Sequence, residues 1–151
     1  MKRSKRMQTV ERVVSEVERK RAESLAACER RVAECESRLA ELEGYMKSYA
    51  EQFQARAGNG IGAAGLRDFQ TFMARLGEAV KQQTQIVLQA RADRDAELRT
   101  WQHAAQRAEA VGGLVKRWQS EEQRQHEKRE QLESDERSQR PSPHPLSLRG
   151  T

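Results

Sequence analysis

The apolar residues of the first third of the chain recur in alternating steps of three and four. From Leu25 to Phe53 they hold this spacing for four heptads, through Leu25, Cys28, Val32, Cys35, Leu39, Leu42, Met46, Tyr49 and Phe53. A seam of this period is typical of a coiled-coil helix. Upstream, the same alternation continues in a shifted frame through Val10, Val14, Val17, Arg21 and Ser24. The two frames join near Cys28, which predicts a local stutter there. We expect a first helix over residues 4–57.

A second helical pattern covers residues 66–140. Its seam reads Phe69, Met73 (or Phe72), Leu76, Val80, Gln83, Val87, Ala90, Arg94, Leu98, Trp101, Ala105, Ala108, Val111, Val115 and Trp118. Polar residues interrupt the seam at Gln83 and Arg94, and several seam positions are alanine, so we expect close pairing of modest stability. The adjacent glycines Gly112 and Gly113 predict a weak point or bend in this helix.

A glycine-rich stretch separates the two patterns. Four of the nine glycines lie between Gly58 and Gly65, and glycine is about 1 kcal/mol less favourable than alanine inside a helix. We therefore expect a loop over residues 58–65. If residue 61 is its centre, apolar residues meet in most layers, with Phe53 facing Phe69, Met46 facing Leu76, Leu42 facing Val80, Cys35 facing Val87 and Val17 facing Ala105.

The expected fold is all-α, with two long helices in an antiparallel coiled-coil hairpin over residues 1–140. Beyond Trp118 the second helix has no partner left on the first, so residues 119–140 form a C-terminal helical extension. Leu132 is the only aliphatic residue in this extension, and a helix that is polar all round is either exposed or awaits a partner. The three prolines all follow residue 140, so residues 141–151 read as a disordered Pro-rich tail.

Composition suits this architecture better than it suits a compact globule. Apolar residues make up 36% of the chain and charged residues 34%, and a long helix needs only one apolar stripe. Residues 1–21 hold eight Lys or Arg against three Glu, which accounts for the whole net charge of +5. This basic end is either a contact for an acidic partner or a solvated helix start.

Several function classes find no support in the sequence. Cys28 and Cys35 lie too far apart along one helix to bridge, the three histidines are scattered, and no phosphate loop or catalytic triad is present. We therefore expect neither an enzyme nor a metal or cofactor site. No apolar run reaches the ~20 residues of a membrane span, and the basic N-terminus lacks the apolar core of a secretory signal, so we expect a cytoplasmic protein.

The chain resembles the FliJ family of flagellar export proteins. The resemblance rests on the order and spacing of four stretches, namely Leu42–Tyr49, the Gly60-Ile61 loop, Asp68–Ala79 followed by Trp101, and Lys128–Arg140. Departures from the family pattern are the Gly112-Gly113 pair, the Pro-rich tail and a glutamine at position 83 of the partner face. The resemblance implies a non-enzymatic, stalk-like hairpin of the type III export apparatus at the cytoplasmic face of the inner membrane, near the flagellar base.

The resemblance also implies partners for the two ends of the hairpin. Its free ends would insert in the ring of the FliI-type export ATPase and promote its assembly and activity. Its tip would contact the linker of the export gate protein FlhA, and family members are also implicated in handling export chaperones. The charge excess at one free end and the polar helix without an internal partner at the other suggest ring-binding candidates: Arg3, Arg6, Arg12, Arg19, Lys128 and Arg129.

Tip candidates come from apolar residues close to the bend. Tyr45 and Tyr49 are four apart and share a helical face, and helix two has more apolar groups here than one seam can hold. Phe72 and Ala79 would then remain near the surface, whereas Tyr49, Leu76 and Phe72 are equally compatible with ordinary core positions. The candidate gate-binding set is Tyr45, Tyr49, Phe72, Leu76, Ala79 and Gln83.

Three alternatives remain at this stage. The first is the equivalent stalk of an injectisome type III secretion system, which shares the mechanism. The second is a basic coiled coil that binds nucleic acid, which the confinement of the charge excess to residues 1–21 disfavours. The third is a homodimeric scaffold, whereas matched layers across residue 61 lead us to expect a monomer.

Overall fold

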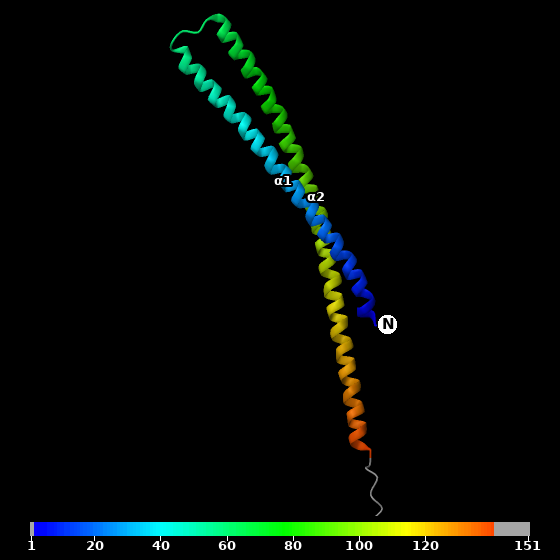
Figure 1. Cartoon of the computed structure of the whole chain (residues 1–151). Helices are drawn as coiled ribbons and strands as arrows, with labels where there is room; N and C mark the ends of the chain where they lie inside the picture. The colour runs from blue at the N-terminus through cyan, green and yellow to red at the C-terminus, as the bar shows by residue number, and fades with distance from the viewer. Residues whose placement is uncertain (1, 141–151) are drawn as a thin grey trace, which may run out of the picture. The chain divides into compact units, whose positions relative to one another are not determined.

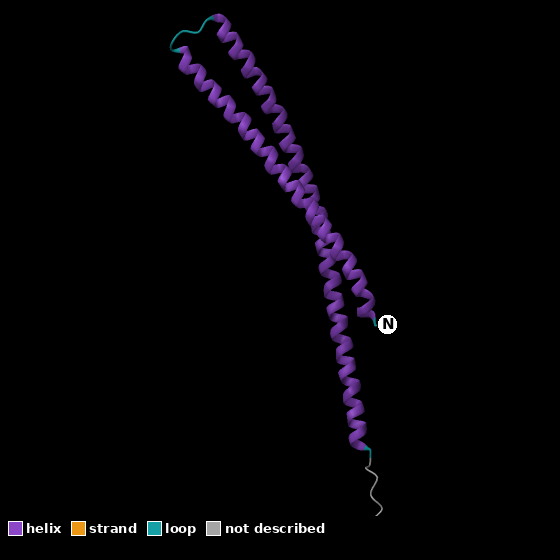
Figure 2. Ribbon diagram, viewed as in Figure 1, coloured by secondary structure: helices purple, strands orange, loops and turns teal. Residues whose placement is uncertain are grey.

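The computed structural model describes residues 2–140 and contains two helices joined by a short loop (Figures 1 and 2). Helix α1 spans Arg3–Ala57 and helix α2 spans Ala63–Gln139. Among the described residues there is no strand. The predicted all-α fold, with helices that pair as an antiparallel hairpin, is confirmed. The predicted tail over residues 141–151 lies outside the described residues.

Each helix contributes to two compact units. The hairpin unit comprises residues 16–106 and contains the bend, whereas the terminal unit comprises the described parts of residues 1–15 and 107–151. Neither helix holds a stretch long and apolar enough to cross a membrane, over the residues that the structure describes.

The bend is shorter than the sequence predicted. At the end of α1, the amides of Asn59 and Gly60 donate to the carbonyls of Arg56 and Ala57, at 2.9 and 3.2 Å. Gly60 has φ of 84°, a conformation that favours glycine because it has no Cβ. The Leu66 amide then bonds the Gly62 carbonyl at 3.1 Å. Helix α2 therefore starts at Ala63, three residues before the expected Leu66, and its first turn includes a glycine.

The core of the hairpin unit lies where sequence periodicity placed it. Val32 and Cys35 of α1 pack with Val87 and Ala90 of α2, and half-buried Leu39 packs against them. Closer to the bend, the rings of Phe53 and Phe69 stack at 3.8 Å, as the pairing about residue 61 predicts. Burial of this apolar seam is the main force that holds the helices together.

The predicted frame shift in α1 is wrong. Val10 and Val17 are 40% and 45% exposed, so Val17 does not fill a layer with Ala105. The frame of Leu25 instead continues unbroken toward the N-terminus, through positions that are buried or half-buried, namely Ser4, Glu11 and Glu18. Polar residues can occupy a seam when their hydrogen bonds are satisfied. Glu18 accepts a bond from the Trp101 indole Nε1 at 2.9 Å, and Ser4 bonds Glu122.

Helix α2 continues without interruption through Gly112 and Gly113, where the sequence predicts a weak point or bend. Two glycines weaken a helix by propensity alone, by about 1 kcal/mol each. In the terminal unit, packing of the neighbouring Val115, which is buried, offsets this cost. Tertiary packing commonly overrides propensity in this way.

Candidate functional site

Two of the sequence-predicted tip residues, Tyr49 and Phe72, belong to a cluster of four aromatic rings in the hairpin unit. The Tyr49 ring lies 4.4 Å from that of Phe72 and 5.7 Å from that of Phe69, which in turn stacks on Phe53. Aromatic pairs of this kind contribute about 0.5–1.5 kcal/mol each beyond their buried area. The cluster therefore fixes the helix ends next to the bend and gives this surface a rigid base.

Exposure divides five of the six predicted residues into two groups. Tyr45 and Phe72 are 62% and 42% exposed, whereas Tyr49, Leu76 and Ala79 are half-buried. Large exposed rings over a packed aromatic base are typical of protein-binding surfaces. The sequence left open whether Tyr49, Leu76 and Phe72 are surface or core residues. Tyr49 and Leu76 are half-buried, whereas Phe72 is exposed to solvent while it contacts Tyr49.

Gln83 does not lie on this surface. Its side chain is only 6% exposed, and its Nε2 donates to the backbone carbonyl of Cys35 across the hairpin at 3.0 Å. A buried amide needs such a partner, since leaving it unsatisfied is costly. The structure therefore places Gln83 in the helix seam, at the level of Cys35 and farther from the bend than Phe72.

Sequence reasoning missed a hollow directly at the bend. It has a volume of about 530 Å³, and aromatic side chains of both helices line it together with loop residues, namely Tyr49, Phe53, Arg56, Asn59, Gly60, Ile61, Gly65, Asp68 and Phe69. Loop glycines give no side-chain signal, so the pattern of apolar residues could not reveal it. The hollow extends the aromatic surface toward the loop.

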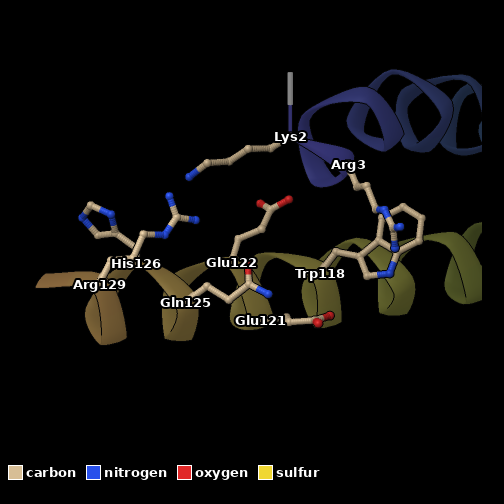
Figure 3. A pocket seen from close by; sticks show the side chains of 8 residues that line it. All are labelled: Lys2, Arg3, Trp118, Glu121, Glu122, Gln125, His126 and Arg129. Carbon is tan, nitrogen blue, oxygen red and sulfur yellow. The ribbon is translucent and has the colours of Figure 1, made fainter. Parts of the chain in front are cut away.

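The terminal unit is organised around the first turn of α1. This turn contains no acidic residue of its own, although the first amides of a helix lack intrahelical partners and its N-terminus favours negative charge. Glu122 of α2 supplies the missing carboxylate. Figure 3 shows its side chain directed at the start of α1, where it accepts bonds from the Ser4 amide at 3.3 Å and from the Ser4 hydroxyl at 2.5 Å.

The Ser4 hydroxyl, by donating to the carboxylate, lowers the pKa of Glu122 from its ordinary value. Partial desolvation opposes this shift, while the Ser4 amide and the charge of Lys2 add to it. The carboxylate is consequently ionised at neutral pH. Glu122 thus acts as a cap for α1 that is supplied by the other helix.

A second contact fixes the same end of α1. The Arg3 guanidinium lies over the Trp118 ring, 5.8 Å from its centroid (Figure 3), within the range of a cation–π interaction. An open hollow of about 380 Å³ lies beside this contact and is lined by Lys2, Arg3, Trp118, Glu121, Glu122, Gln125, His126 and Arg129. This end therefore exposes cationic groups beside a fixed aromatic ring.

The predicted free-end residues fall in different places. Arg3 and Arg129 line this hollow, while Arg6, Arg12 and Lys128 are exposed elsewhere in the terminal unit. Arg19 belongs to the hairpin unit and pairs with Glu16 and Glu23. Because its guanidinium already has two carboxylate partners, Arg19 is the weakest of the six candidates for a partner contact.

Beyond Glu122, the described part of the extension, residues 123–140, is not buried against any other described part of the chain. Every residue from 123 to 140 is exposed, including the aliphatic Leu132. Within residues 2–140 no group of three His, Cys, Asp or Glu side chains is placed to hold a metal ion. Both surfaces are suited to binding. The surface of the hairpin unit offers aromatic rings, and that of the terminal unit offers cationic side chains and an exposed helix.

The Ser4–Glu122 and Arg3–Trp118 contacts were not found by sequence reasoning. The absence of an acidic residue in the first turn of α1 was one available signal, and the position of Trp118 at the end of the predicted seam was another.

Comparison with known proteins gives one match. The family model described as "Flagellar FliJ protein" matches residues 3–143. No curated protein and no solved structure matches the chain.

Proposed function

The chain belongs to the FliJ family of flagellar export proteins, and we propose that it is a non-enzymatic stalk that links the export ATPase to the export gate. The family makes the protein a component of the flagellar type III export apparatus, which favours the flagellar system over the injectisome alternative. Its position would be the cytoplasmic face of the inner membrane near the flagellar base.

The observation that carries this proposal is the extension beyond Glu122. Residues 123–140 are helical nearly to their end and exposed throughout, and an all-polar helix of this kind suits insertion into a polar ring. Lys128 and Arg129 lie on it, while Arg3, Arg6 and Arg12 lie on the paired end of α1. We propose that this end binds and stimulates the FliI-type ATPase ring.

The tip of the hairpin unit is the proposed contact for the linker of FlhA. Tyr45 and Phe72 would supply exposed rings, while Tyr49, Leu76 and Ala79 would supply the half-buried base. Gln83 would hold the helices in register farther from the bend. A further role in handling export chaperones is compatible with the same exposed helices.

Truncation of the extension tests the ATPase contact. A chain that ends at Gln123 keeps the Glu122 cap and Trp118, so the paired end of α1 remains intact. We expect this variant to bind the ring poorly and to lose most of its stimulation of ATP hydrolysis. A chain that ends at Arg140 is the matched control and should stimulate normally. Full stimulation by the shorter chain would refute the proposed contact.

Substitution of the exposed rings tests the gate contact. Tyr45→Ala should weaken binding to a peptide of the FlhA linker while the melting temperature stays close to that of the parent. Phe72→Ala should weaken binding by more than its loss of stability explains, since Phe72 also contacts Tyr49. Binding that survives both changes, or that falls only in proportion to lost helicity, would argue against a binding surface at the tip.

A further inference from the structure

An apolar strip runs along one edge of the hairpin unit and extends past the predicted tip residues. Phe72, Ala79 and Ile86 follow one another at intervals of seven on α2, each directly before a seam residue. Phe72 and Ile86 are both 42% exposed, and Ala79 is half-buried. In a coiled coil, residues seven apart keep the same position relative to the partner helix. The three side chains therefore lie on one edge of α2.

Helix α1 contributes to the same edge. Phe72 contacts Tyr49, which identifies the side of α1 that borders the strip. Tyr45 is 62% exposed and, like the α2 residues, directly precedes a seam residue, Met46. By contrast, Glu36 and Arg91 each directly follow a seam residue, and their ion pair at 2.9 Å closes the opposite edge. Only one edge of the hairpin thus carries large exposed apolar groups.

We propose that Tyr45, Phe72, Ala79 and Ile86, here called the docking strip, bind one amphipathic helix of a partner protein, and that Ile86 is the anchor farthest from the bend. This inference rests on the proposed gate contact at the tip and names the form that the bound partner segment takes. It also assigns to Ile86 the role of outer anchor that Gln83 cannot fill, because the Gln83 amide is buried and bonded to Cys35.

The spacing of the strip argues for a helical partner. Phe72 and Ile86 are fourteen residues apart, which corresponds to about 21 Å along a helix. A partner helix of about four turns spans this length and can present its own apolar residues every seven positions. Such a helix could lie against this edge of the hairpin and cover the exposed apolar side chains of the strip.

Charges beside the strip define the polar flank of the partner. Arg38 lies seven residues before Tyr45, and Arg75 lies three residues after Phe72, so both border the strip. Both are exposed, and neither forms an ion pair with any residue in the described range 2–140. Glu41 is the acidic residue on the same flank of α1. The two arginines fit a helix that carries carboxylates next to its apolar stripe.

The test compares two exposed aliphatic residues of α2. Ile86→Ala removes the outer anchor, whereas Leu88→Ala removes a side chain that is 50% exposed but lies on another face of the helix. Binding of a synthetic peptide of the export-gate linker to the full chain is measured by titration calorimetry. We expect Ile86→Ala to weaken binding about tenfold, as for other apolar anchors of an interface, and Leu88→Ala to change it less than twofold.

Two additional measurements address the helix and the charges. The circular dichroism of the peptide should show a gain of helix on binding. Arg38→Gln and Arg75→Gln should each weaken binding, more at low salt than at high salt, because salt screens exposed charges. A peptide that binds without gaining helix would overturn the proposal.

The remaining outcomes separate this inference from the proposed function. If Tyr45→Ala and Phe72→Ala weaken binding while Ile86→Ala does not, the docking strip is wrong but the gate contact stands. If none of the three matters, the gate contact itself fails. If Ile86→Ala changes only the self-association of the chain, measured by light scattering, the occupant is a second copy and the proposal is overturned. Thermal unfolding of each variant controls for lost folding.

Discussion

At the scale of single residues, polar side chains decide where the helices meet at several points of the seam. Ser4, Glu18 and Gln83 all occupy positions that an apolar residue would normally fill, and each has a hydrogen-bond partner on the other helix. A buried polar group that is satisfied fixes one arrangement, because every alternative leaves it unpaired. Reading the valines alone therefore gave the wrong frame for the start of α1.

The contact between Ser4 and Glu122 predicts a pH dependence of stability. Because folding lowers the pKa of Glu122, the contact stabilises the fold above the ordinary pKa of 4.5, and this contribution is lost as the pH falls through the lowered value. We expect Glu122→Gln to lower the melting temperature at pH 7, by a margin that shrinks as the pH is taken below 4.5.

Glu121→Gln is the matched control for this prediction, because the Glu121 side chain points away from α1 in Figure 3. Its melting temperature should follow that of the parent across the same pH range. A Glu122→Gln difference that stays constant down to the lowest pH would mean that the ionised carboxylate contributes nothing to the fold.

At the scale of elements, the period of the apolar residues predicted both helices and the bend between them, but not the finer boundaries. Helix α2 starts within the glycine-rich stretch because only Gly60 needs a positive φ, so Gly65 can enter the first turn. Composition signals a break, yet it cannot say which glycine makes the turn. The same limit applies to Gly112 and Gly113, through which α2 continues as helix.

Replacing glycine by alanine should change the stability of the fold in opposite directions at Gly113, inside α2, and at Gly60, in the bend. Gly113 is exposed inside α2, and no atom lies within 4 Å of the place where a Cβ would stand. Gly113→Ala should therefore raise the free energy of unfolding, by about 1 kcal/mol. Gly60→Ala should lower it by about 1 kcal/mol, because an alanine at positive φ brings its Cβ too close to the backbone. Urea denaturation followed by circular dichroism measures both.

The comparison has its own internal check, since the substitution is chemically the same at the two sites. If both variants shifted stability in the same direction, backbone conformation would not be the cause of either effect. A loss of stability in Gly113→Ala would show in particular that the glycine pair serves the packing of α2.

At the scale of the whole molecule, the all-α class, the antiparallel pairing and the family were within reach of the sequence. These features depend on patterns that repeat over many residues, so one misassigned residue does not change the prediction. The composition of the interaction surfaces was less accessible. Whether Phe72 is exposed depends on a rotation of one helix by part of a turn, and Glu122 caps α1 through Ser4, which lies 118 positions away in the sequence.

The way the apolar seam is filled predicts that the chain is a monomer in solution. In the hairpin unit the seam residues of each helix are covered by the other helix of the same chain, through the Phe53–Phe69 stack and the cluster around Val87. A second copy could reach only the edges of this unit, where the docking strip is a short run of exposed apolar side chains. Stable protein–protein interfaces generally need about 1,200 Å² or more.

Light scattering coupled to size-exclusion chromatography should thus give a mass close to 17.3 kDa, unchanged over a wide range of protein concentrations. The variant Phe53→Ala sharpens the measurement, because it removes one ring of the internal stack at the bend. If the internal seam is what keeps the chain monomeric, loosening it should increase self-association. A stable dimer of the parent chain at micromolar concentration would instead favour the homodimeric scaffold, with helices that pair between chains.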